Sequence, residues 1–163
     1  MQRVPNFERD PPETEIIQED LEKFCTRERI DVIFRDDRHG VQFEKEIRLH
    51  KGCGKRFTAA LFLLTADHRL WVQVEPYVGT KHIDIESARP QHLNGLTYVC
   101  FALAKDILTG SRTVVLSELA DPDLLSPRNF MMVSLAMLIR GYGLSAANQI
   151  IMKLSRKDEE DEL

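Results

Sequence analysis

The sequence predicts an α+β fold: a two-layer sandwich in which a mostly antiparallel sheet of four to five strands packs against helices, with a helix first along the chain. Three observations favour this class. Apolar residues repeat with helical spacing towards both ends of the chain, alternate with period two between residues 30 and 49, and form strand-length runs up to residue 78. Strands that are grouped before helices, and do not alternate with them, are typical of this class.

The first predicted helix covers residues 13–25. It follows a polar extension of about residues 1–12, which ends in two prolines that suit a helix start. Four side chains recur at spacings that place them on one apolar face: Ile17, Leu21, Phe24 and Cys25. We therefore expect this helix to pack against the sheet.

Five strands are predicted after this helix. The first two alternate apolar and polar residues and are joined as a hairpin by the turn-rich residues 36–40, whereas the third is almost continuously apolar and so belongs in the middle of the sheet. Pro76 cannot donate a ladder hydrogen bond, which places the end of the fourth strand at an edge. The predicted strands cover residues 30–35, 41–49, 57–65, 70–78 and 112–119.

Three helices are predicted in the second half of the chain. Helical spacing runs over residues 93–108, and Gly110 stands where a helix C-terminus favours positive φ. Ser126 and Pro127 suit the cap and first position of the next helix, whose residues 130–139 are nearly all apolar. After an interruption at residues 141–143, a last helical segment covers residues 144–154.

Length and composition indicate one domain. With 163 residues, 43% of them hydrophobic and 29% charged, the chain is unlike a wholly disordered chain, a collagen repeat or a cysteine-stapled miniprotein. We expect a single α+β domain over residues 1–157 and an acidic disordered tail over residues 158–163. Three cysteines and a polar start without a secretory signal predict reduced thiols and a cytoplasmic location. No apolar run approaches the roughly 20 residues of a membrane-spanning helix.

The charge is unevenly distributed along the chain. The formal net charge is −4, but residues 1–23 carry −4 and residues 158–163 carry −5, so residues 24–157 carry +5. Cations concentrate around the predicted first hairpin, where they suit phosphates, nucleic acid or an acidic protein. These candidate anion- or nucleic-acid-binding residues are Arg35, Arg38, Lys45, Arg48, Lys51, Lys55 and Arg56.

Residues 50–56 combine an imidazole, a thiol, three cations and two glycines. As an anion-binding loop this segment lacks the spacing of a phosphate-binding P-loop. Neighbouring cations favour a Cys53 thiolate, which leaves open a thiol-dependent enzyme, but no general base is identified by spacing. His50 and Cys53 have the spacing of half a zinc site, without a second pair of ligands. We expect a solvated loop, no catalytic residue, no cofactor and no metal.

The nearly all-apolar helix at residues 130–139 indicates a non-enzymatic protein-interaction domain, an adaptor or chaperone-like protein that binds another protein or pairs as a homodimer. The element order resembles that of the small α+β folds of secretion chaperones and related adaptor domains, although no residue motif carries this resemblance. The alternative is RNA or DNA binding through the basic hairpin at residues 35–56. The candidate partner-binding residues are Phe130, Met131, Met137, Tyr142 and Leu144.

Overall fold

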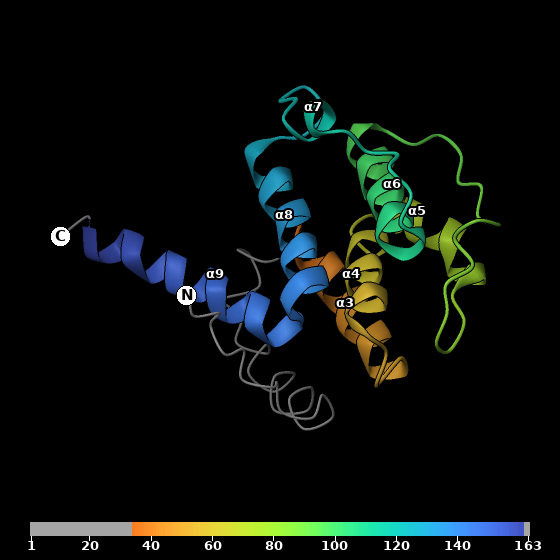
Figure 1. Ribbon diagram of the computed structural model, residues 1–163, viewed down its shortest axis with the longest axis horizontal. Coiled ribbons are helices and arrows are strands. Elements are labelled where there is room, and N and C mark those ends of the chain that lie inside the picture. The colour runs from red at the N-terminus through yellow and green to blue at the C-terminus, as the bar shows by residue number, and fades with distance from the viewer. Residues whose placement is uncertain (1–33, 162–163) are drawn as a thin grey trace, which may run out of the picture.

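A computed structural model describes residues 34–161, with side chains through residue 153 (Figure 1). These residues form seven α-helices and one short 3₁₀ helix and contain no strand, so the predicted α+β sandwich is wrong. The β-type pairing found among them is one isolated bridge, Val78 with Ile83. The elements are α3 (Asp37–Leu49), α4 (Lys55–Leu64), α5 (His68–Val74), η1 (Glu75–Tyr77), α6 (Gly95–Thr109), α7 (Leu116–Leu119), α8 (Pro127–Tyr142) and α9 (Leu144–Asp161).

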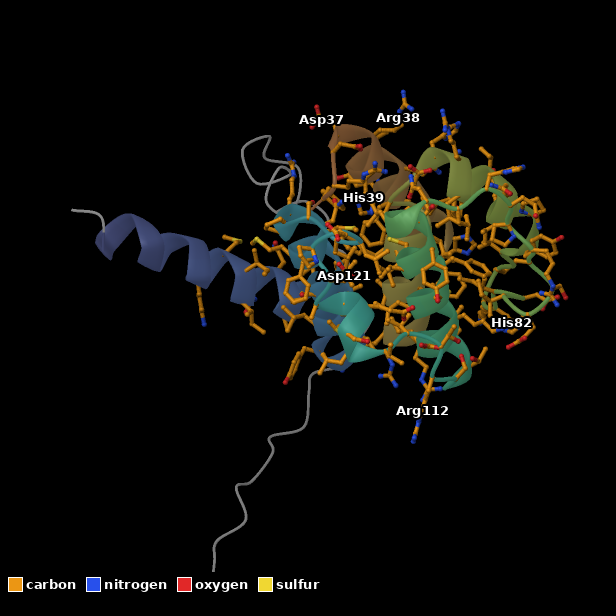
Figure 2. The ribbon with its side chains drawn as sticks, turned by 90° about the horizontal axis from the view of Figure 1, so that it is seen from above. Asp37, Arg38, His39, His82, Arg112 and Asp121 are labelled. Carbon is orange, nitrogen blue, oxygen red and sulfur yellow. The ribbon has the colours of Figure 1, made fainter. Side chains whose placement is uncertain are left out.

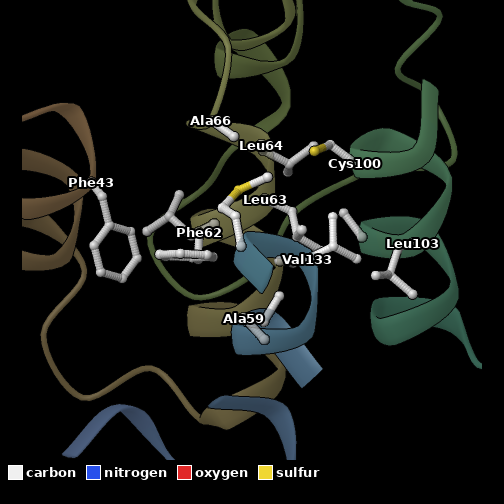
Figure 3. Packing of buried hydrophobic residues seen from close by; sticks show 14 of the residues in the cluster. Phe43, Ala59, Phe62, Leu63, Leu64, Ala66, Cys100, Leu103 and Val133 are labelled. Carbon is white, nitrogen blue, oxygen red and sulfur yellow. The ribbon is translucent and has the colours of Figure 1, made fainter. Parts of the chain in front are cut away.

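The centre of the fold is α4. All six side chains of residues 59–64 have 0% exposure. Figure 3 shows why: α3 covers one side of α4 with Phe43, α6 covers the opposite side with Cys100 and Leu103, and α8 brings Val133 against it. Burying each Leu or Phe contributes roughly 1.5–3 kcal/mol, so this helix supplies much of the stabilisation. The predicted central strand at 57–65 is therefore the central helix of a bundle.

The predicted strand at 41–49 belongs to α3. Its buried residues are spaced as one helix face, and two of them, His39 and Glu46, are polar. Val41 and Leu49, which produced the alternating pattern, are exposed instead. The carboxylate of Asp36 caps the helix by accepting a hydrogen bond from the backbone N–H of His39 at 2.8 Å. Consequently there is no hairpin at 36–40; the predicted strand residues 30–33 and the predicted helix at 13–25 lie outside the described residues.

The other two predicted strands are also wrong. Residues 70–77 fall in α5 and η1, where Leu70, Trp71 and Val74 are buried at the spacing of one helix face, and Val78 forms only the isolated bridge. Residues 112–119 form a loop followed by the single turn of α7. The carboxylate of Asp106 holds that loop by accepting hydrogen bonds from the hydroxyl of Ser111 and from backbone N–H groups of the loop. Because residues 34–161 form no sheet, they do not have the element order of the small α+β secretion chaperones.

The helices predicted in the second half of the chain are confirmed. Asn94 caps α6 in a capping box with Thr97, and Gly110 ends it with a φ of 75°. Ser126 caps α8 and Pro127 occupies its first turn, as predicted. In Figure 1, α9 leaves the body of the bundle and continues through Asp161, into the acidic run at 158–163.

Candidate functional site

The helix α8 has one buried and one exposed side. Its buried side packs on α4 and consists of Met132, Val133, Leu135, Ala136 and Ile139. The opposite side carries large apolar residues near both ends of the helix and in its second half. Four of the five predicted partner-binding residues lie there, with exposed fractions of 44%, 54%, 41% and 63%: Phe130, Met131, Met137 and Tyr142.

Small and half-buried residues complete this exposed side. Ser134 lies between the two pairs of large residues, Leu138 is half-buried beside Met137, and Gly141 is exposed before Tyr142. No charged residue occurs from residue 129 to residue 139. We call this surface the α8 face; it consists of Phe130, Met131, Ser134, Met137, Leu138, Gly141 and Tyr142.

The fifth predicted partner-binding residue does not share this surface. Leu144 begins α9, is half-buried and packs against the hydrophobic core. Gly143 separates the two helices with a φ of 89°, a conformation that favours glycine.

A polar cavity of about 270 Å³ lies between the start of α3 and the start of α5. Neither helix alone forms it, because its walls come from residues 35–42 and 65–69. Three arginines and two histidines line it together with two aspartates and three further residues: Arg35, Arg38, Arg69, His39, His68, Asp36, Asp67, Gln42, Thr65 and Ala66.

An ion pair closes one wall of this cavity. Nη1 of Arg35 donates a 2.8 Å hydrogen bond to Oδ2 of Asp67, and it also lies 3.3 Å from the carbonyl oxygen of Ala66. The other carboxylate oxygen of Asp67 caps α5 by accepting from the N–H groups of Arg69 and Leu70. Burial alone would raise the pKa of Asp67, but the hydrogen bonds from Arg35 and from the two amides outweigh it and hold that pKa below its usual value.

Two arginines of the cavity, Arg38 and Arg69, have exposed side chains. Neither side chain forms an ion pair or a hydrogen bond with another of the described residues. Figure 2 shows Arg38, one of the residues that line the cavity, at one edge of the bundle and Arg112 at the opposite edge. Three arginines against two aspartates give the lining of the cavity a net charge of +1.

The remaining predicted anion-binding residues form no single cluster. Lys45 and Arg48 continue along the exposed side of α3, about two and about three turns beyond Arg38. Arg48 lies 3.8 Å from Glu44. Lys51 is exposed in the loop after α3. Lys55 and Arg56 begin α4, where Lys55 lies beside Gly143 at the turn into α9.

The loop around His50 and Cys53 is anchored to the backbone of Thr80. The Sγ atom of Cys53 donates to the carbonyl oxygen of Thr80 at 3.3 Å, and Nδ1 of His50 donates to the same oxygen at 3.1 Å. The other ring nitrogen of His50 lies 3.6 Å from a carboxylate oxygen of buried Glu46. Burial raises the pKa of the Cys53 thiol despite the nearby cation of Lys81. This arrangement fixes the loop and disfavours the thiolate.

Among the described residues, no group of three or more His, Cys, Asp and Glu side chains is placed to hold a metal ion, so His50 and Cys53 gain no further ligands there. Cys100 is buried in the core, where burial raises its pKa to about 12, and Cys25 lies outside the described part. No helix that the structure describes combines the length and the apolar character needed to cross a bilayer.

Comparisons with known protein families, with curated proteins and with solved structures find no match for this chain. Its candidate sites are therefore those that its own side chains form, the α8 face and the polar cavity.

Of the ten residues that line the cavity, sequence reasoning singled out Arg35 and Arg38 and missed the other eight, including Asp67, His68 and Arg69. These residues lie in or beside helices that were predicted as strands. One signal pointed to the correct structure: an aspartate precedes each helix, at positions 36 and 67, which is the preferred residue type for a helix cap.

Proposed function

We propose that this chain is a non-enzymatic protein-interaction domain that pairs with a second copy of itself through the α8 face. The observation that carries the proposal is the run of large apolar side chains on one exposed side of one helix. Single exposed apolar residues are ordinary, whereas contiguous apolar patches mark interaction surfaces. Covering side chains as large as Phe130 and Met131 contributes roughly 1.5–3 kcal/mol for each one that becomes fully buried.

The pattern of residue sizes on the α8 face favours a second copy as the occupant. Ser134 is small and lies between Phe130 and Met131 on one side and Met137 and Leu138 on the other. In an antiparallel dimer whose two α8 helices cross at Ser134, Phe130 and Met131 of one copy face Met137 and Leu138 of the other. A two-fold axis produces this self-complementary contact in both directions.

Charge is compatible with the same arrangement. The uncharged run from residue 129 to residue 139 brings no like charges together at the crossing point. The arginines that flank the run, Arg128 and Arg140, lie near the helix ends. Helices that pack at the common crossing angle of about 50° diverge towards their ends, which separates these cations.

The size of the α8 face sets the expected strength of pairing. Specific interfaces bury about 800 Å² on each partner, more than one helix face supplies. We therefore expect a dimer that dissociates in the micromolar range, at the weak end of specific association.

The test is the molar mass in solution, measured by light scattering during size-exclusion chromatography over a series of concentrations. The wild-type chain should move from monomer to dimer, and Met131→Glu and Met137→Glu should each remain monomeric because they place a charge in the interface. Val41→Glu is the matched control, since Val41 is an equally apolar and more exposed residue on α3. A strictly monomeric wild type, or loss of the dimer in Val41→Glu as well, overturns the proposal.

Nucleic-acid binding is the second candidate, because Arg38, Lys45 and Arg48 share the exposed side of α3. Such a ridge would contact phosphates, and its affinity would fall steeply with salt. An electrophoretic mobility shift with single-stranded RNA at two salt concentrations tests it. Lys45→Gln and Arg48→Gln should weaken a true complex, and absence of a shift at low salt eliminates it.

The proposed location is the cytoplasm. It is supported by the free thiols of Cys53 and Cys100, which form no disulfide with each other.

A further inference from the structure

We infer that the polar cavity between α3 and α5 binds a phosphate group, either as free phosphate or as a monoester of a small molecule. The cavity of about 270 Å³ is just below the usual range of small-molecule pockets, which begins at about 300 Å³, so its ligand is small. This inference concerns a different surface from the α8 face and does not depend on pairing.

The charges of the cavity favour an anion. Both carboxylates are already engaged: Asp36 accepts from the backbone of His39, and Asp67 accepts from Arg35 and from the first turn of α5. The cation of Arg35 is neutralised by Asp67. Asp36 keeps its negative charge, so Arg38, Arg69 and Asp36 together leave a net charge of +1, and neither of the two arginines has a side-chain partner among the described residues.

The chemistry of these two arginines matches phosphate in particular. A guanidinium presents its N–H donors as a planar fork that fits two phosphate oxygens at once. Arg38 approaches from α3 and Arg69 from α5, so a ligand between them is held from two elements. Exposed His68 lies beside Arg69 and adds a ring N–H donor at the same rim.

The floor of the cavity is rigid before any ligand arrives. The ring of His39 bonds to the backbone of Arg35 on one side and of Phe62 on the other, and the Arg35–Asp67 pair ties α3 to the start of α5. Because the frame is fixed by these bonds, only two exposed arginine side chains have to be ordered on binding, which keeps the entropic cost low.

The experiment is a titration of the full chain, followed by ¹H–¹⁵N correlation spectra, with inorganic phosphate, with glycerol 2-phosphate and with a short single-stranded oligonucleotide, at constant ionic strength. Saturating shifts should be confined to residues 35–42 and 65–69. Tighter binding of glycerol 2-phosphate than of phosphate identifies an organic monoester as the ligand class; equal binding identifies the free anion.

Three variants make the test specific. Arg69→Gln and Arg38→Gln should each weaken phosphate binding by about tenfold, the loss expected for one charge-assisted contact. Neither residue has a side-chain bond that its replacement would break. Arg112→Gln is the matched control, an exposed arginine far from the cavity, and should bind as the wild type does.

Three results would overturn the inference. The first is a set of shifts scattered over the surface, which indicates non-specific ion binding. The second is equal loss of affinity in Arg69→Gln and Arg112→Gln. The third is oligonucleotide binding that depends on Lys45 and Arg48 but not on Arg69, with no response to either small phosphate, since that result assigns anion binding to the ridge of α3.

Discussion

The Nε2 atom of His39 lies 2.8 Å from the carbonyl oxygen of Phe62, in the middle of the buried core. On the other side of the ring, Nδ1 accepts a hydrogen bond from the backbone N–H of Arg35 at 3.0 Å. A carbonyl oxygen only accepts, so Nε2 carries the proton and the ring is neutral. Burial lowers the pKa of His39 from 6.5 to about 4 and outweighs the raising effect of the Phe62 carbonyl. A neutral histidine thus joins the start of α3 to the central helix.

Acid should therefore destabilise the fold through His39. The unfolded chain binds a proton at this residue below about pH 6.5, whereas the folded chain binds it only near pH 4. The contribution of His39 to the free energy of unfolding is therefore complete above pH 6.5 and is lost as the pH falls from 6.5 to 4. The difference corresponds to about 3 kcal/mol. Urea unfolding at several pH values in this window measures it.

His39→Gln is the informative variant for that experiment. The glutamine amide can still donate to the Phe62 carbonyl but cannot titrate, so the decline between pH 6.5 and 4 should largely disappear. Asp67 and Asp106 also have lowered pKa values, but their contribution is lost at lower pH, near and below the usual carboxylate range. An unchanged slope in His39→Gln would show that another group is responsible.

The ion pair between Arg35 and Asp67 should by itself contribute little to the free energy of unfolding. Asp67 should contribute more than Arg35, because its carboxylate also caps α5. With exposed side-chain fractions of 32% and 17%, the pair is partly screened, and Arg35→Gln should cost about 1 kcal/mol. Asp67→Ala also removes the cap of α5 and should cost about 2 kcal/mol. A double-mutant cycle measured by urea unfolding isolates the coupling; a value near zero would mean that the pair contributes nothing to joining the helices.

The helices that were predicted correctly are those whose ends carry specific signals. Asn94, Gly110, Ser126 and Pro127 fix the ends of α6 and α8 through capping bonds and a required positive φ, and both helices are longer than any strand of ordinary length. These signals are local, so they can be recognised without knowledge of the packing.

The sheet was predicted wrongly because hydrophobicity alone does not distinguish a fully buried helix from a central strand. Residues 59–64 are apolar on every side, as they must be in the centre of either architecture. In α3, the buried set includes His39 and Glu46, and no hydrophobic pattern identifies a polar residue as buried. The abundance of Ala and Leu in α4, where a strand would favour β-branched residues, was the available signal for a helix.

The candidate sites were predicted in part. The large residues of α8 were identified from their place in an apolar helix, and the structure exposes Phe130, Met131, Met137 and Tyr142 on one side. The cavity could not be predicted, because it forms only where residues 35–42 meet residues 65–69. Both segments were predicted as parts of a sheet and its turns, and that arrangement does not bring them together as two helix starts.

Cys53 should react slowly with electrophiles. Burial raises its thiol pKa, and the Thr80 carbonyl accepts its S–H, so less thiolate is present at neutral pH than for a free cysteine. Alkylation by iodoacetamide near neutral pH, with the modified residue identified by mass spectrometry, should proceed more slowly at Cys53 than in a free thiol. A reaction faster than that of a free thiol would instead support the hypothesis of a thiol-dependent enzyme that uses Cys53.

The most direct test of pairing through the α8 face is a cross-link at its centre. Ser134→Cys is made in a chain where Cys25 and Cys53 are replaced by serine; Cys100 can stay, because it is buried and its pKa is raised to about 12. An antiparallel crossing at this position brings the two Cα atoms within the roughly 4–7 Å that a disulfide requires. Mild oxidation should give a covalent dimer for Ser134→Cys but not for Ser117→Cys on α7. A Ser134→Cys chain that stays monomeric, or cross-linking at both positions alike, would contradict the proposal.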